Sequence, residues 1–203
     1  LPENIEYKLD DIHLPEDSCN IILCNGNLLK WDSKLKGIMI KSYDDLINSS
    51  TPSENFLELS DFSDNGVIAH NTSAFTDALH LIINQDHILE IPINIISITS
   101  NLGSDRIIFP RVYIHAKANS SSKIYIQHID GGAGCAINSV FEFYLSKSSK
   151  IDLVITNNGE DSVAILNYAF HLEEKSNMKA TFVSFGKKCV KYIIIIDLFI
   201  IDN

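Results

Sequence analysis

Apolar residues follow two different spacings along this chain, and the change falls near residue 85. After that point they occupy alternate positions in short runs, which polar segments separate. A period of two places successive side chains on opposite faces of a β-strand. We therefore predict strands at residues 87–93, 95–99, 106–118, 123–130, 137–145, 150–156, 164–173, 180–185 and 190–201.

The alternation also predicts which side chains share one face of a strand. β-branched and aromatic residues, which favour strands, are frequent in these sets. The sets are Val112, Ile114 and Ala116; Ile124, Ile126 and His128; Phe141, Phe143 and Leu145; Ile151, Leu153 and Ile155; and Leu166, Tyr168, Phe170 and Leu172.

The region before residue 85 has no single period. Residues 20–29 predict a strand, a turn and a strand, because Asn25 and Gly26 both tolerate the positive φ of a hairpin turn. Ser42 can cap a short helical turn over residues 43–47, and the acidic residues at its start favour the positive end of that helix.

Residues 71–84 predict an amphipathic helix. Thr72 or Ser73 can cap it, and Asn84 can end it in the left-handed region. Its apolar residues follow the i, i+3, i+4, i+7 spacing of one helix face, which leaves His80 on the opposite, solvent-facing side. The apolar residues are Phe75, Ala78, Leu79 and Ile82.

Many strands and one clear helix are typical of sandwiches, barrels and β-solenoids alike. The breaks between the predicted strands contain Asn, Ser and Lys rather than repeated Asn-Gly hairpins. Such polar corners suit a solenoid, whose coils stack without crossovers. No strict hexapeptide or nonapeptide repeat is present, so periodicity leaves the three architectures open.

Composition and charge divide the chain in two. It has 203 residues, of which 45% are hydrophobic and 21% charged, as in a packed globular protein. Its net charge of −10 provides no basic surface for nucleic-acid phosphates, which argues against DNA or RNA as a partner. Residues 1–66 hold 13 acidic and 5 basic side chains, and residues 67–203 hold 13 and 11. We predict an acidic N-terminal segment over 1–66, with the hairpin and short helix, and a β core over 67–203.

The longest apolar run, residues 192–201, contains Asp197 and is shorter than the roughly 20 residues that a membrane helix needs. We predict a buried strand there and no membrane span.

No signal peptide is visible, because the first twenty residues are acidic and contain Pro2 and Pro15. The cysteines form no C-x-x-C pair, which favours a reduced, intracellular setting. They are Cys19, Cys24, Cys135 and Cys189.

Nucleophilic and anion-binding motifs are weak in this sequence. No G-x-S-x-G elbow is present. The glycine-rich residues 131–135 could direct backbone N–H groups at an anion, but the Lys and Ser/Thr of a P-loop do not follow. We interpret these residues as a flexible turn between strands.

Metal-binding and acid–base chemistry have scattered candidates only. His115 and His128 lie in neighbouring predicted strands and could meet across a sheet, although a lone His in a strand is more often a satisfied structural residue. A glycosidase would need clustered carboxylates, whereas the core has them far apart. We assign no catalytic, cofactor-binding or metal-ligating residue. The histidines are His13, His70, His80, His87, His115, His128 and His171, and the carboxylates are Asp130, Glu142, Asp152 and Asp161.

The chain contains six short segments. Their combined order and spacing form a more specific pattern than any single segment does. They read NIILCNGNLL, IKSYDDLIN, FTDALHLIINQDHILEIPINI, FPRVYIHAKANSSSKIYIQHI, INSVFEFYL and FVSFGKKCVKYIIIIDL. The residues that carry the pattern are Asn25, Gly26, Phe75, Leu79, Ile91, Pro92, Ile93, Pro110, Arg111, Ile114, Asn138, Val140, Glu142 and Leu145.

In this order the segments resemble the SufB/SufD family of the SUF iron–sulfur cluster assembly machinery, and its SufD branch in particular. The resemblance runs from about residue 20 to the C-terminus. Some positions differ from the family pattern. His80 stands at a usual Asn, and Lys187, Lys191 and Ile193 stand at a usual Gly, Arg and Asp.

The resemblance implies an all-β core built as a right-handed parallel β-helix, with a small mixed N-terminal segment. It implies a non-enzymatic scaffold that works with a SufB-like protein and a SufC-like ATPase in the cytoplasm or the plastid stroma. The complex assembles the iron–sulfur cluster, and we expect this span to bind no cofactor of its own. Neither Cys135 nor Cys189 matches a ligand position of the family.

By the same resemblance the chain is truncated at both ends, without the C-terminal helical region that docks the SufC-like protein. We therefore expect the apolar run at residues 192–201 to form an open end. An open solenoid end makes the chain poorly soluble alone or pairs it with another chain. Two alternatives stay open: a carbohydrate-active β-solenoid enzyme and a non-catalytic structural or interaction domain.

Overall fold

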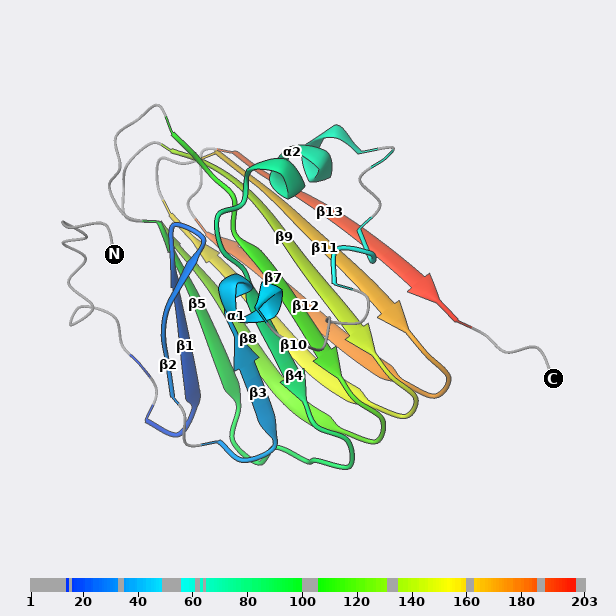
Figure 1. Ribbon diagram of the computed structural model, residues 1–203. Coiled ribbons are helices and arrows are strands. Elements are labelled where there is room, and N and C mark those ends of the chain that lie inside the picture. Colours follow the sequence, from blue (N-terminus) through cyan, green and yellow to red (C-terminus); the bar gives the residue numbers. More distant parts are fainter. Residues whose placement is uncertain are drawn as a thin grey trace.

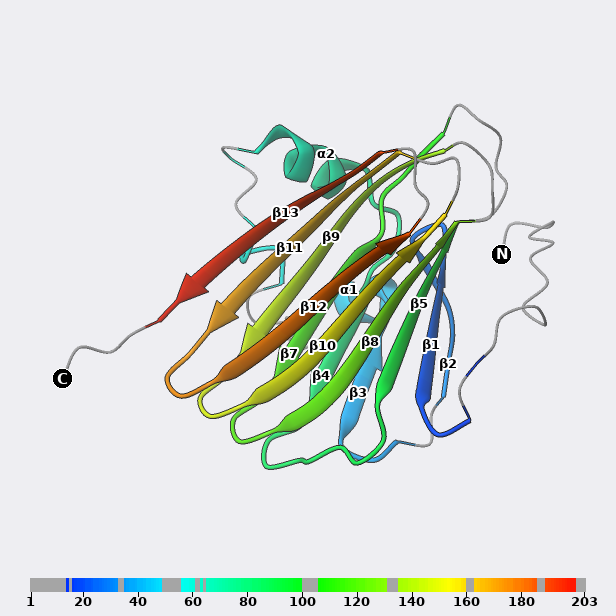
Figure 2. The same ribbon diagram turned by 180° about the vertical axis from the view of Figure 1, so that it is seen from behind.

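The computed structural model describes residues 14, 16–32, 35–48, 56–60, 63, 65–99, 106–130, 135–159, 163–185 and 189–199. Two β-sheets lie face to face, and one side of the molecule carries the two short helices (Figures 1 and 2). Sheet A has the order β12 (Asn177–Phe185), β10 (Lys150–Asn158), β8 (Ser121–Asp130), β5 (Ile93–Thr99), β1 (Cys19–Cys24) and β2 (Asn27–Trp31). Sheet B has the order β13 (Cys189–Leu198), β11 (Val163–Leu172), β9 (Ala136–Leu145), β7 (Arg111–Ala116), β4 (Leu79–Ile83) and β3 (Ile38–Lys41), and β6 (Ile107–Ile108) pairs with β9.

From β4 onward the chain alternates between the two sheets and winds into a β-solenoid of about four turns. Each strand from β4 to β11 pairs in parallel with the strand of its own sheet that lies one coil later. The predicted parallel β-helix is therefore confirmed. A solenoid of this kind places every second side chain between the sheets, where the larger of two apolar clusters forms; Ile22, Ile96 and Ile98 form the smaller one.

The in-register pairing of the strands stacks similar side chains on one another along the core. Ile124 of β8 is opposite Ile93 of β5 and Leu153 of β10, and all three are buried. Phe141 and Tyr168 are paired in the same way in sheet B, with their ring centroids 5.4 Å apart. The predicted shared faces are thus confirmed, because parallel in-register pairing keeps one face of every strand turned inward.

A tight turn that recurs once per coil connects sheet B to sheet A. Asp86, Asn119, Ser148 and Lys175 occupy equivalent positions with φ of 60°, 58°, 59° and 60°. The turns stack through backbone hydrogen bonds, such as Asn119 N to Lys147 O at 3.1 Å and Ser148 N to Glu174 O at 3.0 Å. The backbone conformation of the turn repeats, but the residue type at its positive-φ position does not. The repeat is therefore not visible in the sequence.

Two local predictions before residue 85 are confirmed. Asn25 and Gly26 have φ of 50° and 89° and connect the antiparallel strands β1 and β2. Ser42 caps α1 (Tyr43–Ile47) by accepting the Asp45 backbone N–H, and the Asp45 carboxylate accepts the Ser42 backbone N–H in return.

The predicted helix over residues 71–84 is wrong in its position. Helix α2 (Gly66–Ala74) is capped by Asn65, and residues 79–83 form strand β4 instead. The alternating Leu79, Leu81 and Ile83 are fully buried, since β4 lies between β3 and β7. Residues 79–83 therefore form a strand because they pair with β3 and β7, although the spacing of their apolar residues also fits a helix.

In the structure, a proline interrupts two of the predicted strands. The prediction for residues 87–93 is largely wrong, because only an isolated bridge at Ile88 forms before β5 begins after Pro92. The prediction for residues 106–118 is divided into β6 and β7, with Pro110 just before β7. Proline has no N–H to donate to a sheet ladder, which explains both interruptions.

The apolar run near the C-terminus is not the buried strand that we expected. Strand β13 lies at the edge of sheet B, and the side chains that its register turns towards the core are 47% exposed at Ile194 and 62% exposed at Ile196. No helix in the described part of the chain has the length and hydropathy needed to cross a bilayer. The boundary between residues 66 and 67 stays a prediction.

Candidate functional site

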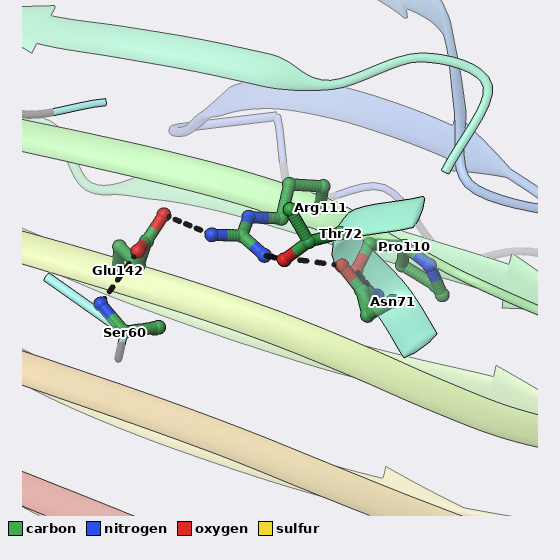
Figure 3. Close-up of polar contacts among 6 residues, drawn as sticks. All are labelled: Ser60, Asn71, Thr72, Pro110, Arg111 and Glu142. Atoms are coloured by element: carbon green, nitrogen blue, oxygen red, sulfur yellow. Dashed lines mark hydrogen bonds and ion pairs between the residues drawn. The ribbon is translucent and has the colours of Figure 1, made fainter. Parts of the chain in front are cut away.

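A buried ion pair lies on the outer face of sheet B, beneath α2 (Figure 3). Arg111 Nη2 of β7 donates to Glu142 Oε2 of β9 over 2.8 Å, and both side chains are completely buried. Burial lowers the pKa of the Arg111 guanidinium, and the charge of Glu142 opposes that shift. A charge pair without water is costly unless its other hydrogen-bonding groups also find partners. Apart from Arg111 Nε, the side-chain nitrogen and oxygen atoms of this pair do so among the described residues.

Those partners come from two segments that cross the sheet. Arg111 Nη1 donates to Asn71 Oδ1 at 3.2 Å and to Thr72 Oγ1 at 3.1 Å, both near the end of α2. Glu142 Oε1 accepts the backbone N–H of Ser60 at 2.9 Å. The ion pair therefore fixes both α2 and the segment at residues 56–60 to the solenoid (Figure 3).

A chain of side-chain amides continues the network across the strands. Asn71 Nδ2 donates to the carbonyls of Pro110 at 3.2 Å and Asn138 at 2.7 Å. Asn138 Nδ2 returns a hydrogen bond to the Val67 carbonyl at 2.8 Å, and Asn167 donates to Asn138 Oδ1 at 3.3 Å. We conclude that these residues specify how α2 docks, because they are buried and are directed at one another.

The resemblance had singled out Arg111, Asn138 and Glu142 without giving them a role. The structure brings them together, although Arg111 and Asn138 are 27 positions apart in sequence, because one coil of the solenoid lies between them. Sequence reasoning missed Asn71, Ser60 and their contacts. The one available signal was a charged residue of each sign inside two mostly apolar predicted strands.

His115 and His128 do not meet, so the pairing that we considered is wrong. His115 is on the outer face of sheet B, with Nε2 2.9 Å from Ser146 Oγ. His128 of β8 points between the sheets, where its Nε2 lies 2.9 Å from Tyr168 Oη. Consecutive strands of a solenoid belong to opposite sheets, which separates residues that appear adjacent in sequence. The described residues contain no group of three or more His, Cys, Asp or Glu side chains placed to hold a metal ion.

His80 was expected on a solvent-facing helix surface and is instead buried on β4. Its ring stacks on Tyr113, with centroids 5.0 Å apart. Burial lowers the pKa of His80 to about 4, and the nearby charges of His115 and Lys41 act in the same direction. A histidine of this kind is neutral at physiological pH and serves packing rather than proton transfer.

The cysteines are all free thiols and do not cluster; Cys19, Cys24 and Cys135 are buried and Cys189 is exposed. Burial raises the pKa of Cys19 to about 11, which disfavours the reactive thiolate. Three further candidates, the glycines within residues 131–134, Asp161 and His13, lie outside the described residues.

The carboxylates that a glycosidase would need are not paired. Glu142 is held in the ion pair on sheet B, whereas Asp152 is exposed on β10 of sheet A. Retaining and inverting glycosidases both require two carboxyl groups on either side of one bond. This pair of residues therefore gives no support to a carbohydrate-active enzyme.

Comparison with known families relates the chain to iron–sulfur cluster assembly. Residues 98–198 match the family described as SUF system FeS cluster assembly, SufBD core domain. The matched segment runs from the end of β5 to the end of β13 and contains Arg111, Asn138 and Glu142. No curated protein matches the chain.

Proposed function

We propose that this chain, whose residues 98–198 match the SufBD core domain, is a non-catalytic scaffold subunit of SUF iron–sulfur cluster assembly, of the SufD branch. The observation that carries the proposal is a parallel solenoid over the matched residues, in which the motif residues form a buried network. A solenoid of stacked coils is rigid and presents long faces, which suits a protein that positions partners rather than reacting substrates.

We propose that the partner surface is the end of the solenoid formed by β12 and β13, which we call the open end. Among the described residues these are the edge strands of sheets A and B at that end, and several large apolar side chains are exposed there. Unpaired edge strands with exposed apolar residues favour the addition of further β-structure. The exposed residues are Phe185 at 59%, Ile194 at 47%, Ile196 at 62%, Leu198 at 59% and Phe199 at 57%.

We propose that a SufB-like protein extends the two sheets at this end, and that a SufC-like ATPase acts on the resulting pair. The cluster is the cargo of the complex. Among the described residues no ligand set for it is present, so we propose that the partners supply the ligands. A cytoplasmic or plastid-stromal location is part of the same proposal.

Co-purification tests this function directly. The tagged chain is expressed with SufB-like and SufC-like proteins, and the amount of each that is retained is measured. The double variant Ile194→Lys and Ile196→Lys introduces charge into the open end and should abolish retention of the SufB-like protein. The control Ile88→Lys changes a 72% exposed isoleucine beside a tight turn and should retain it.

Two results would contradict the proposal. Failure of the unaltered chain to retain either protein would favour a plain interaction domain with other partners. Equal retention by the open-end and control variants would place the interface elsewhere on the solenoid. Light scattering of the purified chain adds a second measurement, since a clean, stable monomer would argue against an open end that associates with other chains.

A further inference from the structure

A cavity of about 400 Å³ lies where β9, β11 and β13 end on the outer face of sheet B. The segment at residues 56–60 forms its far wall, and the ion pair of Figure 3 holds that segment in place through Ser60. We call this cavity the strand-end pocket. Its lining residues are Glu58, Leu59, Tyr144, Phe170, His171, Glu173, Ile195, Asp197 and Phe199.

One wall of the strand-end pocket is aromatic. The rings of Tyr144 and His171 stack with centroids 4.7 Å apart and an interplanar angle of 16°. The Phe199 ring follows, 6.4 Å from that of His171. The face of an aromatic ring attracts a cation through its quadrupole, and a planar guanidinium can also stack on it.

The other lining groups make the pocket negative. Glu173 is fixed in place, because Oε1 accepts the Tyr144 hydroxyl at 2.5 Å and Oε2 accepts the Lys147 backbone N–H at 2.8 Å. Asp197 lies 2.8 Å from His171 Nδ1 but is 72% exposed and can accept from a ligand as well. Glu58 adds a third carboxylate, and none of the described residues that line the pocket is Lys or Arg. The described lining therefore has three carboxylates and one histidine as its ionisable side chains besides the Tyr144 hydroxyl.

We propose that the strand-end pocket accepts an arginine side chain that a partner protein presents. A guanidinium would stack on the aromatic wall and donate its planar fork of N–H groups to the Glu58 and Asp197 carboxylates. Lysine would supply the charge without the stacking surface.

Neither arginine of the 203-residue sequence is placed to enter the pocket. The sequence contains only Arg106 and Arg111. Arg111 is buried in the ion pair, and Arg106 precedes β6, which pairs with the opposite end of β9 at Ala136. The proposal does not depend on the identity of the partner or on a role in cluster assembly.

Methyl NMR of the whole chain, labelled at isoleucine δ1, tests the proposal. The probe is N-acetyl-arginine methylamide, and the reference is its neutral citrulline analogue of nearly the same shape. We expect the arginine probe to shift the Ile195 signal in a saturable way, and citrulline to leave it unchanged. Ile88, which is exposed and does not line the pocket, should not respond to either compound.

A pair of variants locates the interaction. The double variant Glu58→Gln and Asp197→Asn should weaken binding of the arginine probe by about five-fold, because both changes remove a partly exposed charge. Glu174→Gln removes a nearby carboxylate that does not line the pocket and should leave binding unchanged.

Three outcomes would overturn the proposal. In the first, Ile195 does not respond to the arginine probe. In the second, citrulline shifts Ile195 as strongly as arginine does, which would mean that charge is not recognised. In the third, spermidine, a free polyamine, binds more tightly than the blocked arginine, which would identify a small-molecule site rather than a protein-docking site.

Discussion

Arg111 and Glu142 show what a single residue pair contributes to this fold. Both charges are removed from water and depend on each other and on Asn71, Thr72 and Ser60. Such a pair stabilises little compared with an apolar replacement of both partners, but the loss of one partner leaves a buried charge uncompensated. The pair therefore specifies where α2 and the segment at residues 56–60 dock more than it adds to stability.

Replacing Arg111 alone should be strongly destabilising. In Arg111→Met the Glu142 carboxylate stays buried without its counter-charge, and we expect the free energy of unfolding to fall by about 3–5 kcal/mol. Urea denaturation followed by circular dichroism measures the loss. The surface variant Glu174→Gln, which breaks ion pairs to two exposed lysines, should cost less than about 1 kcal/mol.

The double variant Arg111→Met with Glu142→Leu provides the matched control. It removes both charges, and we expect it to recover a large part of the stability that the single variant loses. If Arg111→Met is no more destabilising than Glu174→Gln, the ion pair does not hold the docked segments.

His80 makes stability depend on pH. Its pKa is about 4 in the folded chain, against 6.5 for an ordinary histidine, so between these values the unfolded chain binds a proton that the folded chain does not. Stability should therefore fall as the pH is lowered from 6.5 to 4, and the His80 contribution should not change outside that window.

Thermal unfolding of the protein and of His80→Phe across pH 4 to 7 isolates this contribution. Phenylalanine keeps a ring against Tyr113 and cannot titrate, so the variant should lose less stability towards low pH. Parallel curves for the two proteins would show that other groups control the acid sensitivity.

At the scale of the element, the recurring turn is what closes each coil. It requires a residue with positive φ at one position, and the chain uses Asp86, Asn119, Ser148 and Lys175 there. Asn and Asp adopt the left-handed region with little cost, whereas β-branched residues adopt it poorly. Stacking of one turn on the next, through backbone hydrogen bonds, holds even Ser148 and Lys175 in this conformation.

Substitution at Lys175 tests the backbone requirement with little change in packing, since its side chain is exposed. Lys175→Val should be less stable than Lys175→Asn by about 1–2 kcal/mol, because only asparagine tolerates a φ near 60°. Both variants lose the same charge, so denaturant midpoints compare backbone cost alone. Equal midpoints would mean that the turn relaxes without cost.

At the scale of the whole molecule, each coil contacts only its neighbours, so stability is expected to vary along the solenoid axis. The central strands have a coil on both sides, whereas β12 and β13 have one neighbour each among the described residues. The buried network also lies over the central strands β7, β9 and β11 and reinforces them.

Hydrogen exchange followed by mass spectrometry should reveal this gradient. Peptides from β9 should exchange most slowly, and peptides from β13 should exchange much faster, because β13 opens without disturbing a second neighbour. Binding of a partner at the open end should slow exchange in β12 and β13. Uniform protection of both regions would mean that the solenoid opens only as one unit.

Much of the architecture was accessible from the sequence. Alternating apolar residues predicted most of the strands after residue 85, and Asn25-Gly26 and Ser42 predicted a hairpin and a helix cap, because these features depend on local geometry. The helix near residue 75 was misplaced since its spacing fits two structures equally well. The buried site was visible only as separate motif residues.

The sequence by itself determined most of the strands after residue 93, which of their faces are apolar, and the hairpin turn at Asn25-Gly26. Only the tertiary structure decided that Arg111 meets Glu142, that His115 and His128 face opposite ways, and that Tyr144, His171 and Asp197 line one pocket. The physical reason is the coil: residues about one turn apart in sequence become neighbours only when strands pair in register, and the register depends on the whole stack.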